Sequence, residues 1–313
     1  MEMQVIDVED IFSFNKNFVD LNIEDGVFKN LKYKKIRFKS SILTEYEENN
    51  YVYGYIFYPK KEFNGINIIA IHPVHESVPA FEYACAFYFT RYGYKVSYIS
   101  LPYHRERTPK GTKCGELFFS NDDEEYFLSM RQSIVDLRQF IYFLNTYEKD
   151  DNFYAIGLSL GAILLHLLMG IDKNIKKGVS IMGGGNILRL TWEGLYGVSS
   201  RIYYKKIGFN FNSYKKELKE YLKYVDEVKE KGKIIKGEKL WYLVDPLTYS
   251  SFNNPRNVIL INGLFDLVIT RKSVLELWER IGKPRLIWIP STHYMIPVFF
   301  PYVLYLSNKF FKK

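Results

Sequence analysis

The sequence contains little cysteine, since only Cys85 and Cys114 occur among its 313 residues. Two cysteines so far apart provide neither a disulfide framework nor the closely spaced ligands of a metal site. We therefore expect no bound metal and a reducing compartment. The N-terminus also lacks the basic region and the apolar core of a secretory signal, and both absences together predict a cytoplasmic protein.

Uninterrupted apolar runs and nucleic-acid motifs are missing as well. Residues 286–306 are apolar but broken by Pro290, Pro297 and Pro301, so they predict a strand, a loop and a terminal helix. The net charge is +8, yet the lysines are scattered among glutamates. This pattern predicts a solvated basic surface, no nucleic-acid partner and no stable membrane insertion. The sequence leaves a monomer and a homo-oligomer both open.

What the sequence does contain is an alternation of buried strands with helices. The expected strands are short and apolar, and they lie at residues 66–71, 94–99, 152–156, 177–182, 257–262 and 285–289. Such alternation is typical of an α/β fold with a mainly parallel central sheet and helices on both faces. Two aromatic-rich segments, residues 31–38 and 51–58, are expected to form an antiparallel pair at one edge of this sheet.

The same patterns divide the chain into an arm, a core and a cap. Residues 1–30 carry weak signals and are expected to pack as an N-terminal arm, while residues 31–182 and 252–313 are expected to form the core. In residues 183–251 the alternation stops and apolar residues follow helical spacing, which predicts an inserted helical cap. Its first residues, Gly183-Gly184-Gly185, lack the lysine of a phosphate loop and are interpreted as a tight exit from the sheet.

The most informative segment runs from the expected strand at 152–156 into Gly157-Leu158-Ser159-Leu160-Gly161 and then into an apolar helix. Gly-x-Ser-x-Gly between a strand and a helix is typical of a nucleophile elbow, a turn that strains its central residue. The two glycines are needed because a side chain there would collide with neighbouring backbone. The pattern predicts that the Ser159 hydroxyl stands clear of the sheet, close to the Leu160 N–H at a helix N-terminus.

A serine hydroxyl requires a base within hydrogen-bond reach and an acid that orients the base. Asp266 and His293 each follow a predicted core strand, so both are expected on loops at the carboxyl edge of the sheet, where ligands bind. The chain order Ser, Asp, His fits three successive loops of one sheet. Asp136 and Asp245 are alternative acids, but neither follows a core strand.

The other four histidines have competing interpretations. His72 closes a strand and is expected to shape the following loop, whereas His166 lies among leucines of the elbow helix and is expected to be a core residue. His75 and His104 lie on carboxyl-edge loops and are candidate substrate-binding residues. Each of these two could instead hold its loop in place.

From residue 31 to the C-terminus, the chain resembles an α/β-hydrolase. The resemblance rests on the Gly157–Gly161 elbow, on Asn262-Gly263-Leu264-Phe265-Asp266-Leu267-Val268 and on Thr292-His293-Tyr294. It implies that Ser159 is the nucleophile, Asp266 the orienting acid and His293 the general base. The stretch Leu101-Pro102-Tyr103-His104-Arg105-Glu106-Arg107-Thr108-Pro109 also resembles a subgroup of microbial members.

The resemblance further implies a second oxyanion amide on the loop after the third strand. This chain departs from the common His-Gly-x pattern there, because it has His72-Pro73-Val74. Proline has no N–H, so the Val74 N–H is the expected donor beside the Leu160 N–H.

The implied function is cleavage of a small-molecule carboxylic ester through an acyl-enzyme intermediate, with no cofactor. An aminopeptidase or another serine peptidase is the alternative, because ester and amide cleavage share one triad. A compact carboxylate cluster that grips a substrate amine would favour the peptidase, and the sequence shows none. A binding protein that kept the fold without catalysis is a third hypothesis, which the intact Ser159, Asp266 and His293 disfavour.

Overall fold

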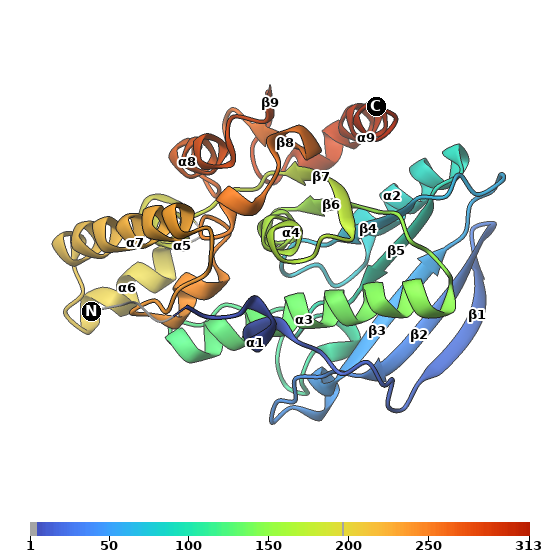
Figure 1. The fold of residues 1–313 in the computed structure, drawn as a ribbon, viewed down its shortest axis with the longest axis horizontal. Coiled ribbons are helices and arrows are strands. Elements are labelled where there is room, and N and C mark those ends of the chain that lie inside the picture. The colour runs from blue at the N-terminus through green and yellow to red at the C-terminus, as the bar shows by residue number, and fades with distance from the viewer. Residues whose placement is uncertain (1–4, 196) are drawn as a thin grey trace.

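The computed structural model describes residues 5–195 and 197–313, and Figure 1 shows their fold. Within these residues, nine strands form one sheet in the order β1-β2-β3-β5-β4-β6-β7-β8-β9. Neighbours from β5 to β9 are parallel, whereas β1, β2, β3 and β5 pair antiparallel. The strands are β1 Asn22–Phe28, β2 Leu31–Lys39, β3 Tyr51–Phe57, β4 Asn67–Ile71, β5 Lys95–Ile99, β6 Phe153–Leu158, β7 Ile175–Ile181, β8 Val258–Gly263 and β9 Arg285–Ile289.

Helices cover both faces of the sheet, as the strand and helix alternation predicts. Buried side chains of α2 and α9 pack on one face, and those of α3, α4 and α8 pack on the other (Figure 1). The helices are α1 Val8–Phe12, α2 Ala80–Phe89, α3 Asp123–Tyr147, α4 Leu160–Ile171, α5 Ile187–Glu193, α6 Val198–Lys206, α7 Phe211–Lys231, α8 Arg271–Ile281 and α9 Phe300–Phe311. Strands β4, β5 and β6, which lie between these layers, are buried at every residue. This burial on both faces explains why apolar residues predominate in these strands without alternating with exposed polar ones.

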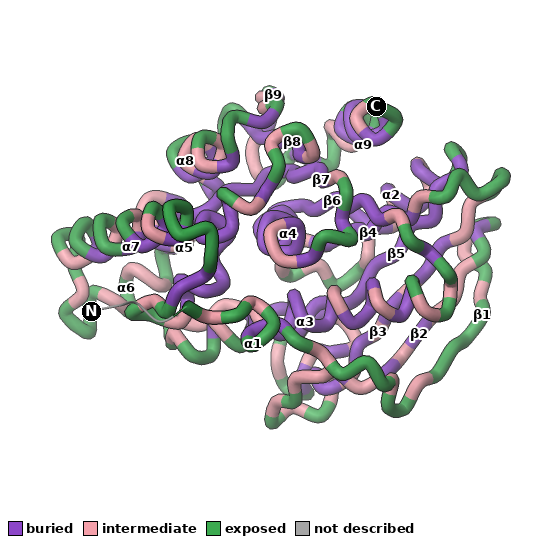
Figure 2. Tube along the Cα trace, viewed as in Figure 1, coloured by how far each residue is buried: buried purple, intermediate pink, exposed green. Residues whose placement is uncertain are grey.

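The edge of the sheet differs from the sequence-based expectation. The predicted antiparallel pair exists as β2 and β3, but β1 pairs outside β2 and forms the edge. β1 belongs to residues 1–30, which were expected to form only an arm. Its sequence, Asn-Ile-Glu-Asp-Gly-Val-Phe, has few β-forming residues, and most of them are exposed (Figure 2). Charged, exposed edge strands of this kind give weak sequence signals because pairing rather than burial holds them.

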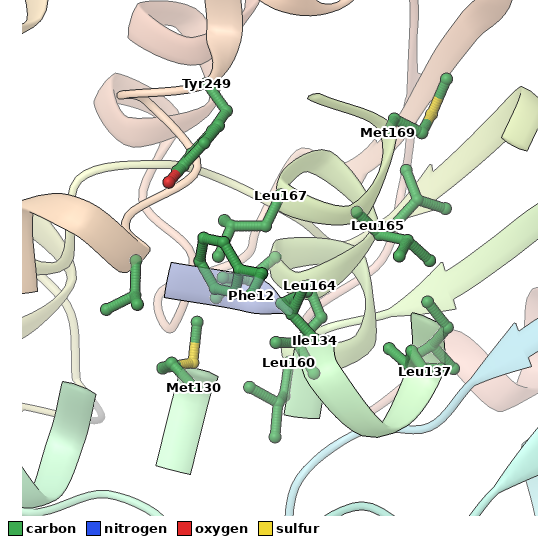
Figure 3. Close-up of a cluster of buried hydrophobic side chains, with 14 of the residues drawn as sticks. Phe12, Met130, Ile134, Leu137, Leu160, Leu164, Leu165, Leu167, Met169 and Tyr249 are labelled. Atoms are coloured by element: carbon green, nitrogen blue, oxygen red, sulfur yellow. The ribbon is translucent and has the colours of Figure 1, made fainter. Parts of the chain in front are cut away.

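The rest of the N-terminal segment connects the core to the cap. Phe12, at the end of α1, is fully buried, and Figure 3 shows it between α3 and α4 near Met130, Ile134 and Leu164. Nearer the start of the chain, the Ile6 N–H donates to the Ile234 carbonyl (3.0 Å), and Val5 bridges Ile235. Residues 5 and 6 therefore contact the segment that follows α7.

Residues 183–251 contain α5, α6 and α7 and a short 3₁₀ turn, Leu240–Val244. The Asn210 side chain accepts from the N–H groups of residues 212 and 213, and Gly232 ends α7 in a left-handed conformation. Such capping satisfies end groups that have no partner inside a helix. In the described residues, no helix combines the length and the apolar character that crossing a membrane would require. The proline-broken stretch at 286–306 folds as β9, a 3₁₀ turn and the first half of α9.

Candidate active site

Ser159 lies in a sharp turn between β6 and α4. Its backbone angles are φ 53° and ψ −112°, a combination that side chains normally avoid. A Cβ on Gly157 would lie 2.2 Å from the Gly161 carbonyl oxygen, and one on Gly161 would lie 1.9 Å from the Ile71 carbonyl oxygen. Both contacts are with main chain, which cannot rotate away. The predicted elbow and its two glycine requirements are therefore confirmed.

Three side chains from separate strand ends meet at this turn. The Ser159 Oγ lies 3.0 Å from His293 Nε2, and His293 Nδ1 lies 2.7 Å from Asp266 Oδ2. The second oxygen of Asp266 accepts from the N–H groups of Val268 (2.8 Å) and Ile269 (2.9 Å), which fixes the carboxylate. A carboxylate at Nδ1 favours the tautomer that keeps Nε2 unprotonated toward the serine. This arrangement can transfer the serine proton to the imidazole.

Two residues, Leu160 and Val74, were expected to supply amides to an oxyanion site. Leu160 is the first residue of α4, where N–H groups have no partner within the helix. Val74 lines the same cavity as Ser159. The loop that carries Val74 is braced by the fully buried His72, whose Nδ1 donates to the Pro73 carbonyl (2.7 Å) and whose Nε2 accepts from the Leu101 N–H (3.0 Å). Burial holds the pKa of His72 well below its usual range, so this ring stays neutral.

The two candidate substrate-binding histidines occupy different places. His75 borders the cavity, and its Nδ1 donates to the Cys114 carbonyl (3.0 Å). His104 is fully buried behind the loop, where its Nε2 accepts from the His75 N–H (3.2 Å) and its Nδ1 donates to the Pro102 carbonyl (2.8 Å). Burial lowers the pKa of His104 to about 4. His104 therefore contacts the loop rather than the cavity.

Sequence reasoning missed a charged cluster beside the same loop. Arg105 pairs with Glu76 (2.8 Å) and with Glu82 (2.7 Å), and its Nε also donates to the Glu76 carbonyl (3.2 Å). Although burial opposes it, the carboxylates of Glu82 and Glu76 raise the pKa of Arg105. Burial and the neighbouring Glu82 raise the pKa of Glu76 to about 8. The only sequence signal was the 101–109 stretch, which did not indicate a partner.

Ser159 and His293 open into a cavity of about 660 Å³. Its walls are mainly apolar and come from both the core and the cap, so the cap residues form a roof over the elbow. The principal apolar wall residues are Phe119, Leu160, Ile163, Leu188, Leu190, Trp192, Tyr204, Ile207, Phe209, Trp241, Val268, Ile269, Ile296 and Phe300.

Four carboxylates also line the cavity, and the protein itself engages each of them. Asp122 caps α3, and Asp123 accepts from the N–H groups of residues 240 and 241 (both 2.8 Å). Glu217 pairs with Lys239 (2.7 Å) and accepts from the Trp241 indole (3.3 Å). Glu76 is held by Arg105, as described above. Asp122, Asp123 and Glu217 thus lie near one another around residues 239–241, and each of them is held by a contact within the protein.

The alternative acids and the remaining histidine lie elsewhere. Asp136 is buried against Arg107 (2.8 Å) and accepts from the Ser40 hydroxyl (2.6 Å). Asp245 accepts from the N–H groups of residues 186 and 187, at 3.0 and 2.7 Å, and thereby holds the start of α5. His166 is fully buried in α4.

The comparisons with known proteins show a likeness in structure only. No protein-family model matches the chain, and no curated protein matches its sequence. The chain is similar to the solved esterase Pf2001 of Pyrococcus furiosus, with a TM-score of 0.58, 19% identity, and coverage of 95% of this chain and 98% of that one. It is also similar to an acetyl xylan esterase from Paenibacillus sp. R4, with a TM-score of 0.60, 11% identity and coverage of 95% and 91%.

A third similar structure is the acylaminoacyl peptidase of Pyrococcus horikoshii, with a TM-score of 0.60 and 16% identity. This likeness covers 91% of the present chain but only 42% of the peptidase chain. With the sheet order and the elbow described above, these likenesses show that the chain has the α/β-hydrolase fold.

Proposed function

We propose that this protein is a serine hydrolase that cleaves a small-molecule carboxylic ester. The observation that carries the proposal is the chain of contacts from Ser159 Oγ through His293 to Asp266, at 3.0 and 2.7 Å, on the floor of an apolar cavity. A hydroxyl aligned in this way with an imidazole and a carboxylate is an activated nucleophile. Solved esterases that share the fold are consistent with this proposal.

In the proposed reaction, His293 removes the Ser159 proton while Oγ attacks the ester carbonyl carbon. The Leu160 and Val74 N–H groups donate to the resulting oxyanion. When the intermediate collapses, the C–O bond to the alcohol breaks and the alcohol leaves with the proton from His293. A water molecule then gives its proton to His293 and attacks the acyl-enzyme, which releases the acid and restores Ser159. Asp266 stabilises the imidazolium in both halves of the reaction.

The bound carboxylates of the cavity favour an ester over a peptide with a free amino group. A substrate amine would need an anionic partner, whereas Asp123, Glu217 and Glu76 are already engaged by N–H groups or cations of the protein. These contacts are partly buried, so breaking one of them would leave a polar group without its partner, which is costly. The apolar walls suit an uncharged acyl chain instead.

A serine peptidase is the second candidate, because the same three side chains serve amide cleavage and one structure with this fold is an acylaminoacyl peptidase. Its substrate would have to present no free amine to the cavity. The third hypothesis, a binding protein, requires that Ser159 not react at all.

The test combines a fluorophosphonate probe with paired substrates. We expect the probe to label the wild type and spare Ser159→Ala, and p-nitrophenyl esters to be cleaved faster than aminoacyl anilides. Ser159→Ala should lower kcat by at least about 10³-fold with an unchanged melting temperature. Faster anilide cleavage would establish the peptidase, and an unlabelled, folded wild type would establish the binding protein.

A further inference from the structure

Exposed apolar side chains surround the opening of the cavity. Ile207 of the cap and Tyr294, next to His293, both line the cavity and yet are 62% and 78% exposed. Leu267, next to Asp266, and Val298 are 63% and 71% exposed. Large exposed apolar groups scattered singly over a surface need no explanation, but a group of them around one opening indicates an interaction site.

Main-chain hydrogen bonds join the segments that carry these residues. The Leu195 N–H donates to the Leu267 carbonyl (2.8 Å), which joins the cap to the loop after β8. The N–H groups of residues 264 and 265 donate to the carbonyls of residues 289 and 291 (2.9 and 3.1 Å), which joins that loop to the segment carrying Tyr294. We call this surface the apolar rim, and its residues are Leu195, Ile202, Ile207, Leu267, Tyr294 and Val298.

Two segments of the chain supply most residues of the apolar rim, and the charged residues of both segments are basic. Residues 194–216 contain five basic residues, Arg201, Lys205, Lys206, Lys215 and Lys216, and no acidic residue. Residues 280–313 also contain no acidic residue. The acids that flank the first segment are neutralised, because Glu193 pairs with Arg189 (2.9 Å) and Glu217 pairs with Lys239 (2.7 Å). Lys216 pairs with Glu220 (3.8 Å), whereas the exposed Lys205 and Lys206 have no ion pair with an acid of the described residues. Apolar residues interleaved with such cations are typical of segments that bind an anionic lipid surface.

We propose that the apolar rim docks on an anionic lipid surface, so that the ester enters the cavity directly from the lipid. This inference rests on the proposed esterase function and narrows its substrate class to esters dissolved in lipid. An apolar acyl chain would then pass from lipid to the apolar walls without crossing water. A second copy of this chain fits the rim less well, because a two-fold contact presents the same surface from both copies and sets the cationic segment against itself.

Binding to vesicles tests the docking without using catalysis. We expect the wild type to bind phosphatidylcholine vesicles that contain phosphatidylglycerol at least about tenfold more tightly than vesicles of phosphatidylcholine alone. The preference should shrink as salt is raised from about 50 to 300 mM, because salt screens exposed charges. Equal binding to both vesicle types, or no binding to either, would overturn the proposal.

Variants of the rim separate the lipid surface from other partners. Val298→Glu and the double variant Lys205→Glu/Lys206→Glu should each weaken binding to the anionic vesicles by about tenfold or more. The matched controls are Val27→Glu, at a 69% exposed position on the distant edge strand β1, and Lys60→Glu/Lys61→Glu, and both should bind like the wild type. If gel filtration instead shows a dimer that Val298→Glu dissociates, the rim is a self-association surface and the lipid proposal is wrong.

Hydrolysis of a water-soluble ester distinguishes failure of the docking from failure of the function. None of the rim or control substitutions replaces a residue that lines the cavity, so all four variants should cleave p-nitrophenyl acetate in water at the wild-type rate. Soluble-ester cleavage without vesicle binding would overturn the docking and leave the esterase. Vesicle binding by a protein that cleaves no ester would overturn the proposed function, and with it the route of the ester from lipid to the cavity.

Discussion

The floor and the roof of the cavity are built in different ways. On the floor, every residue of α4 from Leu160 to Met169 is buried, and a Cβ added at either elbow glycine would lie only 1.9 or 2.2 Å from a main-chain oxygen. In the roof, α6 has no buried residue within its described length. Its attachments include side-chain contacts, such as those from Arg201 to the carbonyls of residues 191 and 194 (2.6 and 2.7 Å).

This difference separates the chemistry from the selectivity. A main-chain contact cannot be relieved by changing a rotamer, so the position of Ser159 is fixed by the sheet beneath it. Side-chain attachments can be exchanged at small cost. The roof can therefore change its shape while the reacting groups stay in place, and substitutions in the two regions should have effects of different size and kind.

The largest effect should follow from adding one methyl group to the floor. Gly161→Ala places a Cβ 1.9 Å from the Ile71 carbonyl oxygen, so we expect a loss of at least about 4 kcal/mol of unfolding free energy or no folded protein. The matched roof variant is Gly232→Ala at the end of α7, where no atom lies within 4 Å of the new Cβ. It should cost only about 1 kcal/mol, through its positive φ. Urea denaturation of both variants measures their unfolding free energies. Similar losses in Gly161→Ala and Gly232→Ala would contradict the difference between floor and roof.

The loop with Val74 should be sensitive in a third way, because buried charge rather than glycine holds it. Arg105→Ala removes the cation between Glu76 and Glu82, so we expect kcat for a soluble ester to fall by about ten- to a hundredfold while KM changes little. Arg105→Lys keeps the positive charge but loses the planar guanidinium that can bind two carboxylates at once. Its kcat should therefore lie between those of the wild type and Arg105→Ala. The control is Arg201→Ala in the roof, and equal losses of kcat from both alanine variants would show that the loop is not specially positioned.

The floor and the presence of a helical cap were predictable from the sequence, whereas the contacts that hold the roof were not, for a physical reason. Gly157, Ser159 and Gly161 lie within one five-residue turn, so local rules define them. Asp266 and His293 were found because each directly follows an apolar strand, and strand ends of a parallel sheet converge at one edge. Whether these residues catalyse a reaction stays a prediction.

Other features depend on contacts between distant parts of the chain. Arg105 donates a hydrogen bond to Glu76, which lies 29 positions earlier in the sequence, and no pattern in residues 101–109 identifies Glu76 as the partner. His104 was a candidate for substrate contact, yet it faces the His75 N–H because Gly115 leaves room for its ring. β1 was missed because its stability comes from pairing with β2. A sequence pattern reports burial and local geometry, but it does not identify partners.

His166 is a polar exception within the floor and sharpens the comparison. Neither ring nitrogen has a hydrogen-bond partner among the described residues, and burial lowers the pKa of His166 to about 3. Because the unfolded chain binds this proton near pH 6.5 and the folded chain does not, stability falls as the pH drops from 6.5 toward 3.

His166→Leu should abolish the loss of stability at low pH. At pH 7 it should raise the unfolding free energy by up to about 1 kcal/mol, because an unpaired buried polar group is replaced by an apolar one. Thermal unfolding at pH 7 and pH 5 checks both parts. The gain of the variant over the wild type should be larger at pH 5, and an equal gain at both values would contradict neutral burial of the ring.

The smallest effect on stability should come from the roof, at Ile207. Ile207 and Ile163 both line the cavity, but Ile207 is 62% exposed and Ile163, on α4, only 6%. Ile207→Ala should change the unfolding free energy by less than about 0.5 kcal/mol, whereas Ile163→Ala should cost about 2 to 4 kcal/mol. Ile207→Ala should nevertheless raise KM for p-nitrophenyl octanoate a few-fold and leave the acetate unchanged, since only the longer chain reaches the roof. If Ile207→Ala destabilises the protein as much as Ile163→Ala does, the roof is as rigidly packed as the floor.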